Sequence, residues 1–334
     1  MKAMVLSSCA PIETAPLQWK DVPDPEPGPG QVRVRVKTCG ICRTDLHIIE
    51  EELPFPGHPV VPGHQVVGTV DALGRDATRF DVGERVGIAW LHHTCGECHF
   101  CTSGQENLCE KQRFTGYHQW GGYAEYTVVP EAFAYRIPHG LADAEATPLL
   151  CAGIIGYRSL KRSLVQPGQR LALYGFGSSA HIVIQIAIHW GCKVYVCSRN
   201  ESHAQLALSL GAQWAGSRAE DMPVLTDSAI IFAPAGNLVP VALEHLTKGG
   251  TLALAGIYMS EIPAMDYEKH LFYEKNVHSV TANTRQDGRE LLETAARIPI
   301  RPKVQLFPLQ AANQALLALK EDRINGSGVL SVES

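Results

Sequence analysis

Hydrophobic and polar residues alternate in short runs along the first 150 residues, with prolines and glycines between the runs. Val32, Val34 and Val36 alternate with polar residues in the segment 31–38, and residues 64–73, HQVVGTVDAL, form a second candidate strand. Such alternation, interrupted by turn-forming residues, is typical of short antiparallel strands. We therefore predict a mostly antiparallel, barrel-like β domain in this part of the chain.

The pattern changes near residue 168, where apolar runs of strand length begin to alternate with helical segments. The predicted order is strand 170–175, helix from residue 178, strand 193–198, helix 201–211, strand 229–232, helix 238–246 and strand 251–257. This alternation is typical of a doubly wound parallel sheet. After residue 297 a strand, a helix at 311–321 and a last strand follow, and we assign them to the first domain. The predicted α/β fold thus has one domain from 1–150 and 298–334 and another from 151–297.

Length and charge narrow the class of protein. A chain of 334 residues is long enough for two domains, and its net charge of −5 is spread over mixed charges without a basic run. No apolar segment is long and uninterrupted enough to span a bilayer, and the N-terminal MKAMVLSSCAPIE shows no export signal. We expect a cytoplasmic protein that acts on a small molecule and binds neither nucleic acid nor a membrane.

Four cysteines lie close together in the segment CGECHFCTSGQENLC: Cys95, Cys98, Cys101 and Cys109. Two successive CxxC steps and a short spacer bring four thiolates within reach of one tetrahedral zinc ion, which leaves no position open for substrate. Disulfides or free thiols are the alternative, which a reducing compartment disfavours. The segment of about 92–112 is therefore predicted to be a structural zinc lobe.

A dinucleotide fingerprint follows the strand at residue 170. Gly175, Gly177 and Ala180 have the GxGxxG/A spacing, and glycines there allow a tight turn and the close approach of a pyrophosphate to a helix N-terminus. At the end of the next strand Ser198 and Arg199 replace the acidic residue that would hold a ribose 2′-hydroxyl. Because arginine pairs with a 2′-phosphate, we predict that NADP(H) is favoured over NAD(H).

Three further candidate metal ligands lie far apart in the sequence: Cys42 in CGICRTDLH, His64 in PGHQVVG and Cys151 in TPLLCAG. Spacing alone cannot join them, and an isolated Cys or His is more commonly a packed side chain. These motifs, together with CGECHFC, YAEY and GFGSSA, resemble the zinc-containing alcohol dehydrogenases of the medium-chain dehydrogenase/reductase family over essentially the whole chain.

The resemblance implies a GroES-like catalytic domain, a Rossmann cofactor domain and a homodimer or homotetramer. It assigns Cys42, His64 and Cys151 to a catalytic zinc with one open position, so that each chain holds two zinc ions. In the family's mechanism zinc lowers the pKa of a bound alcohol, and the resulting alkoxide transfers hydride to the nicotinamide. The neighbouring Cys39 matches a position that does not bind metal.

The resemblance also assigns roles to residues around the zinc. Thr44 and His47 match a proton relay, and Asp45 matches a carboxylate that orients the zinc-bound histidine. An N-cap or turn hydroxyl, an exposed ring and a helix N-terminal carboxylate are their respective structural alternatives. The remaining candidate cofactor contacts are Arg43, Gly256, Ile257 and Arg285.

Three positions depart from the family pattern. Gln65 stands where most members carry Glu, which removes a negative charge near the metal, so we also count it among the catalytic candidates. Ile155 replaces a threonine near the nicotinamide, and Ser327 replaces an arginine that contacts pyrophosphate in several relatives. Arg285 is a candidate substitute for that arginine.

The expected activity is hydride transfer between a primary aliphatic or aromatic alcohol and NAD(P)⁺. Trp90, just after a predicted strand, is the candidate substrate contact, with ordinary core packing as the alternative. A polyol or threonine dehydrogenase is the alternative enzyme, and a catalytically weak NADPH-binding sensor is the alternative from another class. A nucleic-acid-binding zinc ribbon is disfavoured by the acidic charge balance.

Overall fold

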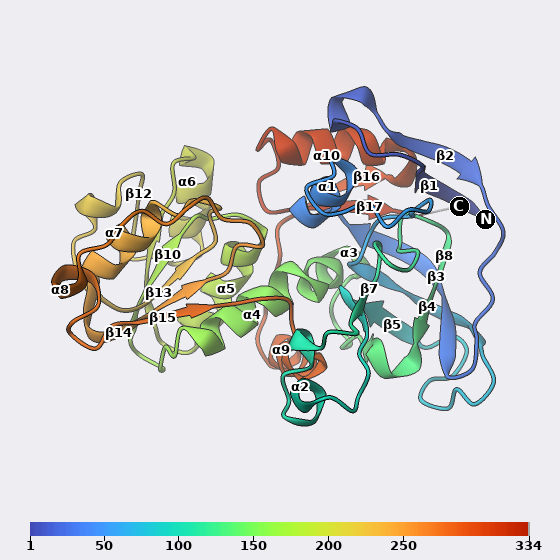
Figure 1. Cartoon of the computed structure of the whole chain (residues 1–334), viewed down its shortest axis with the longest axis horizontal. Coiled ribbons are helices and arrows are strands. Elements are labelled where there is room, and N and C mark those ends of the chain that lie inside the picture. Colours follow the sequence, from blue (N-terminus) through green and yellow to red (C-terminus); the bar gives the residue numbers. More distant parts are fainter. Residues whose placement is uncertain (333–334) are drawn as a thin grey trace. The chain divides into compact units, whose positions relative to one another are not determined.

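The computed structural model describes residues 1–332, which form two compact units. Unit 1 contains Met1–Cys151, Ala282–Arg297 and Pro302–Ser334, and unit 2 contains Ala152–Thr281 and Ile298–Arg301. One unit is built on a mostly antiparallel sheet and the other on a parallel sheet (Figure 1). The predicted α/β class with two domains of these kinds is confirmed.

Unit 1 is built around a seven-stranded sheet with the order β16-β17-β3-β4-β5-β9, in which β8 also pairs with β3. All of its strand pairs are antiparallel except β16 with β17. Two-stranded sheets, β1-β2 and β6-β7, complete the unit. Its strands are β1 (Lys2–Leu6), β2 (Leu17–Asp21), β3 (Gln31–Gly40), β4 (Val66–Leu73), β5 (Arg85–Ile88), β6 (Leu91–His93), β7 (Arg113–Phe114), β8 (Tyr126–Pro130), β9 (Ala134–Arg136), β16 (Val304–Pro308) and β17 (Ser327–Ser331).

The alternation seen in the sequence of β3 decides which of its side chains are buried. Val32, Val34 and Val36 are buried on one face, where they join the core of unit 1, while Arg33 and Arg35 point away and pair with Asp71. A period of two residues separates the two faces of a strand.

The helices of unit 1 are α1 (Arg43–Ile49), α2 (His99–Thr102), α3 (Asp143–Ala146), α9 (Arg285–Arg297) and α10 (Ala312–Lys320).

Unit 2 contains a six-stranded sheet in which every neighbouring pair is parallel. Its strand order is β12-β11-β10-β13-β14-β15, and helices connect the strands (Figure 1). The strands are β10 (Arg170–Tyr174), β11 (Lys193–Cys197), β12 (Trp214–Gly216), β13 (Thr226–Ile231), β14 (Leu246–Leu254) and β15 (Asn276–Ser279). The helices are α4 (Ala152–Arg162), α5 (Ser178–His189), α6 (Glu201–Ser209), α7 (Leu238–Glu244) and α8 (Tyr267–His270).

The strand order of unit 2 reverses between β10 and β13, the two central strands. The chain runs outward from β10 through β11 to β12 and then returns to β13 on the other side. Such a reversal leaves a crevice at the carboxyl ends of the two central strands, where doubly wound sheets bind dinucleotides. The short strands β12 and β15, which our sequence analysis did not predict, form the two edges of the sheet.

The predicted boundary near residue 297 is wrong for two short segments. Helix α9 was expected in the cofactor domain, yet it belongs to unit 1, where Gly288 lies so close to the Tyr135 ring that an added Cβ would be 2.5 Å from it. Residues 298–301 were expected in the first domain and belong to unit 2, where the Arg301 backbone N–H donates to Gln185 at 2.9 Å. These contacts lie between segments distant in sequence, so local patterning does not report them.

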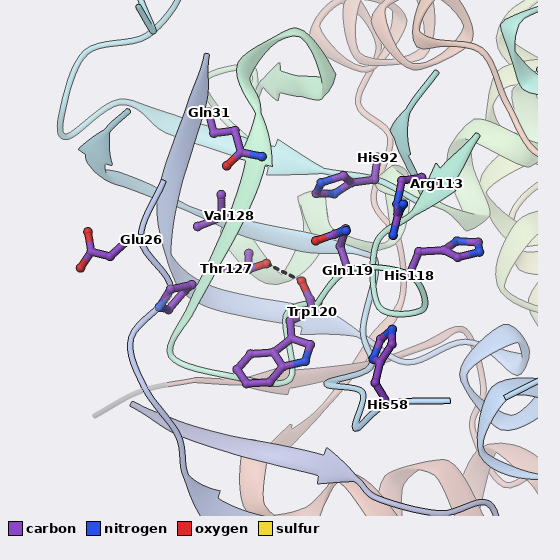
Figure 2. A pocket seen from close by; sticks show the side chains of 11 residues that line it. Glu26, Gln31, His58, His92, Arg113, His118, Gln119, Trp120, Thr127 and Val128 are labelled. Carbon is purple, nitrogen blue, oxygen red and sulfur yellow. Dashed lines mark hydrogen bonds between the residues drawn. The ribbon is translucent and has the colours of Figure 1, made fainter. Parts of the chain in front are cut away.

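A cavity of about 490 Å³ opens in unit 1 beside β6, β7 and β8 (Figure 2). Three histidines and Arg113 are among its lining residues, and none of the seven cysteines and histidines predicted to bind zinc lines it. Within residues 1–332 there is no helix with both the length and the apolar character needed to cross a membrane.

Candidate active site and metal centres

Cys42, His64 and Cys151 come together in unit 1, with their potential ligand atoms all within 4.8 Å of one another. Cys42 is the N-cap of α1, His64 lies just before β4, and Cys151 is the last residue before α4. The Sγ atoms of Cys42 and Cys151 are 4.0 Å apart, close to the separation of about 3.8 Å for two thiolates on one tetrahedral zinc. The three candidates therefore form one possible metal site, which spacing in the sequence could not reveal.

His64 carries the clearest sign that the site fits a cation. Its ring is buried, Nδ1 lies 3.3 Å from Oδ1 of Asp45 without hydrogen-bond alignment, and Nε2 has no hydrogen-bond partner in the described chain. Buried polar atoms rarely lack partners unless an ion or water completes them. Imidazole and thiolates are ligands that zinc prefers, so these residues suit a zinc ion bound by three protein ligands.

The charges within this group also favour a cation. Burial acts to lower the pKa of His64, but Asp45 and the Cys42 thiol group together raise it to about 10. A hydrogen bond from Cys151 lowers the pKa of Cys42 well below its ordinary value against the effect of burial, and the same hydrogen bond raises that of Cys151. The site therefore stabilises a thiolate beside a positive ring, and a metal ion can replace these protons.

Asp45 organises the backbone around the ligands. Its carboxylate is fully buried and accepts hydrogen bonds from the Cys42 N–H at 2.9 Å, the Gly63 N–H at 3.2 Å and the Tyr123 hydroxyl at 3.1 Å. With His64 beside it, this is the arrangement in which a carboxylate orients a metal-bound histidine. Asp45 was a candidate for this position from the sequence, whereas Tyr123, which lies 78 residues away, was not.

Gly63 is required by the packing of the turn before His64. It has φ of +94°, and a Cβ there would lie 2.3 Å from the Tyr123 ring and 2.7 Å from the Cys39 sulfur. Only glycine adopts this conformation at so close an approach. Cys39 itself is a fully buried thiol and lies outside the group of possible metal ligands.

The two residues of the expected proton relay lie on α1, three positions apart and therefore on one face of the helix. Thr44 is buried with its Oγ1 3.5 Å from the Cys42 sulfur. His47 is more exposed, and its Nδ1 contacts the carboxylate of Glu52. Glu52 was not identified from the sequence, because it follows the end of the helix and its partner depends on how the chain turns there.

Trp90 lies directly against the metal-ligand group. Its ring meets that of His64 edge-on at a centroid distance of 5.0 Å and stacks on Phe114 at 4.5 Å, with Tyr117 at 6.2 Å. The rings of Trp90, Phe114 and Tyr117 together form an aromatic wall, in which Trp90 contacts the candidate ligand His64. Trp90 was a candidate from the sequence, whereas Phe114 and Tyr117 carried no signal that set them apart from core residues.

Three other candidate residues of unit 1 form hydrogen bonds with backbone groups of the protein. Gln65 is buried, and its amide donates to the Ile41 carbonyl at 3.4 Å. The exposed Arg43 donates to the Leu319 carbonyl at 3.4 Å. Ser327 is buried in β17, where its backbone N–H donates to Lys303.

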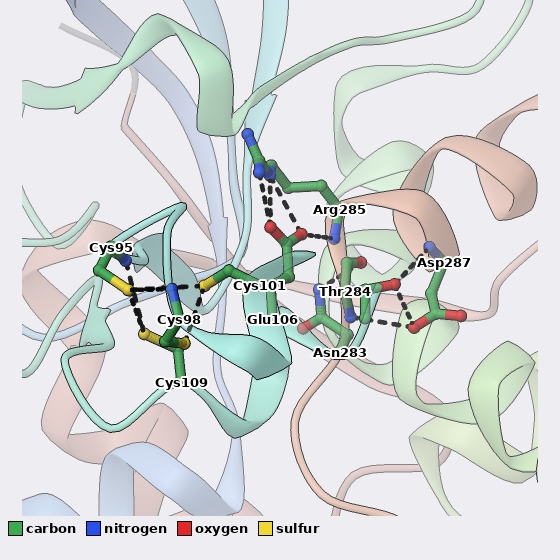
Figure 3. Close-up of polar contacts among 9 residues, drawn as sticks. All are labelled: Cys95, Cys98, Cys101, Glu106, Cys109, Asn283, Thr284, Arg285 and Asp287. Carbon is green, nitrogen blue, oxygen red and sulfur yellow. Dashed lines mark hydrogen bonds and ion pairs between the residues drawn. The ribbon is translucent and has the colours of Figure 1, made fainter. Parts of the chain in front are cut away.

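The four cysteines of the predicted structural lobe form a second group in unit 1 (Figure 3). Cys95 lies 3.8 Å from Cys101 and 3.6 Å from Cys109, and Cys98 lies 3.6 Å from Cys101, measured between sulfur atoms. These separations match the value of about 3.8 Å for a tetrahedral zinc tetrathiolate. Backbone N–H groups of Glu97 and Cys98 lower the pKa of Cys95 to about 6, which favours the thiolate.

An ion pair connects this lobe to α9 (Figure 3). Arg285 donates from its backbone N–H at 2.7 Å and from its guanidinium at 2.6 Å to the carboxylate of Glu106, whose side chain is 9% exposed. The guanidinium also lies over the Phe133 ring at 4.4 Å. Arg285 was expected to contact the cofactor, but here its charge is neutralised by Glu106.

The residues of the dinucleotide fingerprint lie at the junction of β10 and α5 in unit 2. Gly175 directly follows β10 with φ of +89°, and a Cβ there would lie 2.9 Å from the backbone nitrogen of Ala233, just after β13. Gly177 is the N-cap of α5 without a side-chain cap, and a Cβ there would meet no atom within 4 Å. Ala180 is fully buried. The glycines thus leave space at a helix N-terminus, where a pyrophosphate fits.

The remaining cofactor candidates also lie in unit 2. Ser198 is buried after β11, and the exposed Arg199 precedes Asn200, the N-cap of α6. Gly256 and the exposed Ile257 follow β14. Ile155 lies in α4 and is partly buried.

Comparison with known proteins agrees with this geometry. Residues 28–139 match the alcohol dehydrogenase GroES-like domain, and residues 180–297 match the zinc-binding dehydrogenase family. The chain is 48% identical over 337 residues to a probable alcohol dehydrogenase, AdhA, of Mycobacterium tuberculosis (strain CDC 1551 / Oshkosh), covering 99% of this chain and 97% of the relative. The chain belongs to the zinc-containing, medium-chain alcohol dehydrogenases.

Solved structures of this kind have the same fold. A cinnamyl alcohol dehydrogenase of Sorghum bicolor, SbCAD4, is 26% identical, with a TM-score of 0.90 over 99% of this chain and 97% of that one. CAD from Helicobacter pylori, in complex with NADP(H), is 25% identical, with a TM-score of 0.88 over 99% of both chains. The GroES-like and Rossmann-type domains expected from the sequence are thus confirmed for this alcohol dehydrogenase.

The role of Asp45 can be tested through metal affinity. We expect D45N to lower zinc affinity at the Cys42 group by about 10- to 100-fold, the usual effect of losing a carboxylate that orients a zinc-bound histidine. Competition with a chromogenic chelator measures this affinity. D71N, which changes a carboxylate paired with Arg33 and Arg35, should leave it unchanged. Equal zinc affinities in D45N and the native protein would contradict this role.

The Arg285–Glu106 pair can be tested through stability. Burial acts to raise the pKa of Glu106, but hydrogen bonds from Arg285 lower it, so the stabilisation is present at neutral pH and is lost as pH falls through the lowered pKa. We expect E106Q to lower the free energy of unfolding at pH 7 by about 1.5–3 kcal/mol, measured by urea denaturation.

K111A is the matched control for E106Q, since Lys111 pairs with Glu97 where the two side chains are 73% and 75% exposed. We expect K111A to change the free energy of unfolding by less than about 0.5 kcal/mol. If the two variants unfolded at the same urea concentration, the pair would have no special part in holding α9 to the lobe.

Proposed function

We propose that the chain is a zinc-dependent alcohol dehydrogenase or aldehyde reductase that transfers hydride between a primary alcohol and NAD(P)⁺. The observation that carries the proposal is the contrast between two groups of ligands in unit 1. Four thiols surround one position completely, whereas Cys42, His64 and Cys151 offer three ligands and leave the fourth for a substrate oxygen. Two zinc ions per chain, one structural and one catalytic, follow from this contrast.

Residues around the three ligands would carry out the rest of the chemistry. Bound zinc supplies Lewis acidity to the alcohol. Asp45 holds the His64 ring, and the buried Thr44 hydroxyl would accept the hydroxyl proton and pass it towards His47, nearer the solvent. In the family this path includes the cofactor ribose. Glu52, which contacts His47, would orient the ring and stabilise it while it holds the proton.

The aromatic wall supports flat or small apolar alcohols as substrates. The Trp90 ring lies edge-on against His64 and stacks on Phe114, and such aromatic surfaces favour hydrocarbon over a row of hydroxyl groups. A polyol or threonine dehydrogenase would need polar side chains in this position. The sensor alternative is motivated by Gln65 and Ile155, which replace residues that most relatives use.

NADP(H) is proposed as the favoured cofactor because Ser198 and Arg199, instead of a carboxylate, directly follow β11. Arg199 is exposed next to the N-terminus of α6, where it can pair with a 2′-phosphate. The similarity to CAD from Helicobacter pylori, which was solved with NADP(H), agrees with this preference.

A homodimer or homotetramer is proposed on the basis of the exposed surface near β15. This strand lies at the edge of the sheet in unit 2, and apolar side chains are exposed close to it in the sequence: Tyr258, Tyr267, Phe272 and Tyr273. An unpaired edge with exposed aromatic residues is a typical site of association.

The proposed reaction is tested by comparing kcat/KM for benzyl alcohol, sorbitol and threonine in protein with a measured zinc content. We expect two zinc ions per chain and the highest kcat/KM for benzyl alcohol. C151A should lose one zinc and lower kcat/KM by more than about 100-fold, because a Lewis acid supplies several kcal/mol of stabilisation.

C95A is the matched control, since it removes a thiol from the closed group. It should mainly lower thermal stability or assembly and leave the turnover of folded protein close to native. Equal loss of kcat in both variants with intact folding, or one zinc or none in the native protein, would overturn the proposal. Turnover of the alcohols that persists in C151A would also contradict it.

Cofactor preference is tested by kcat/KM for NADP⁺ and NAD⁺. We expect a higher value for NADP⁺ and expect R199A to reduce it by about 10-fold or more, with little change for NAD⁺, since a charge-assisted hydrogen bond is lost. R218A, which changes another exposed arginine of unit 2, should leave the ratio unchanged. A clear advantage for NAD⁺ in the native enzyme would refute the preference.

A further inference from the structure

The cavity of about 490 Å³ in unit 1 contains an unusual concentration of nitrogen donors. His58, His92, His118 and Arg113 line it together with two glutamines, and they come from segments on both sides of the lobe cysteines (Figure 2). The zinc ligands, Thr44 and His47 do not line it, so it is a different site from the proposed active site.

Arg113 gives the cavity a positive charge that the chain does not neutralise. Its side chain is exposed on β7, and no ion pair or side-chain hydrogen bond engages it within residues 1–332. The nearby Lys111, by contrast, pairs with Glu97 at 3.3 Å. Glu26 is the carboxylate among the lining residues; its side chain is exposed, and it lies 3.6 Å from Arg33, which also pairs with Asp71.

The hydrogen bonds of two histidines define where their protons lie. Nδ1 of His118 accepts from the Phe114 backbone N–H at 3.2 Å, so in the neutral ring the proton is on Nε2, which can donate to a ligand. Nδ1 of His58 lies 3.2 Å from the Pro59 carbonyl, which can only accept, so this ring carries its proton on Nδ1.

The positive groups in the cavity act on one another. Burial, Arg113 and His58 lower the pKa of His118. Burial lowers the pKa of the deeper His92 to about 4, with smaller contributions from His93, Arg113 and His118. Cationic groups near one another without a counterion destabilise the charged state of each imidazole. A bound anion would reverse this effect.

Neutral groups complete a site of mixed character. Oε1 of Gln31 accepts from the Gly28 N–H at 2.8 Å, which leaves its NH₂ group to donate. The Trp120 Nε1–H donates to the Pro59 carbonyl at 3.1 Å, so the indole contributes mainly its apolar ring (Figure 2). Pro25 and Val128 add further apolar surface. The volume exceeds that of a bare oxyanion, so the ligand has room for a small organic group.

We propose that this cavity binds a small organic oxyanion, a phosphate ester or a carboxylate, through the Arg113 guanidinium and the Nε2–H of His118. Guanidinium binds both groups through two parallel N–H···O bonds. Trp120 would cover the organic part. Binding strengthens as pH falls, because protonation of His118 adds a positive charge near Arg113, opposite the anion.

The experiment is calorimetric titration of the zinc-loaded enzyme with phenyl phosphate and benzoate, which distinguish the two oxyanions. Spectra of ¹⁵N-histidine-labelled protein locate the binding through the Nε2 signals of His118 and His58. We expect R113Q to weaken binding of the preferred probe by about 10-fold or more, as expected for a lost charge-assisted bond. R75Q, which changes an exposed arginine outside the cavity, should bind like the native enzyme.

H118N provides a second variant, because the Asn Oδ1 can still accept from the Phe114 N–H while the Nε2 donor is lost. It should also weaken binding by several-fold. Sulfate, whose charge is constant between pH 6 and pH 8, should bind more tightly at pH 6. Equal binding to R113Q and the native enzyme, or unchanged histidine signals at saturating probe, would overturn the proposal. Neither result depends on turnover, so failure here is separate from failure of the proposed enzymatic function.

Discussion

The buried carboxylate of Asp45 is the interaction on which the metal site of unit 1 depends. A charge with no exposure to water is tolerated only when donors surround it, and here the backbone of Cys42, the backbone of Gly63 and the hydroxyl of Tyr123 provide them. These donors come from α1, from the turn before β4 and from the segment before β8. One side chain therefore brings together the segments that hold Cys42 and His64, two of the three candidate metal ligands.

The two groups of candidate metal ligands, the four lobe cysteines and the set of Cys42, His64 and Cys151, differ in how far apart their residues lie in the sequence. This difference explains their different chemistry. The closed group comes from 15 consecutive residues, so it can form around a metal with little help from the rest of the fold. The open group needs β3, β4 and the segment before α4 in their final positions. A metal site with a vacant ligand position thus depends here on the tertiary structure. The structural lobe is built from residues close together in the sequence, and the ion pair of Arg285 with Glu106 joins it to α9.

Patterns in the sequence predicted those structural features that depend on residues close together in the chain. The alternating valines of β3, the turn from β10 into α5 and the cysteine quartet all appear in the structure as expected. Contacts between distant residues carried no such pattern. The pairs Tyr123 with Asp45 and Arg285 with Glu106 join residues 78 and 179 positions apart, so neither they nor the placement of α9 could be read from periodicity. For Cys42, His64 and Cys151 the resemblance to a family supplied what spacing could not.

Gln65 and Trp90 show how neutral side chains set the electrostatics of the open site. Two thiolates balance the charge of a zinc ion, and Asp45 adds a negative charge that its hydrogen bonds already stabilise. A glutamate in place of Gln65 would add another buried charge, and the backbone carbonyl of Ile41, which the amide now faces, would repel it. The amide instead donates to that carbonyl. The Trp90 ring is likewise neutral and lies edge-on against His64, so neither neighbour adds to the negative charge that Asp45 already places beside the ligands.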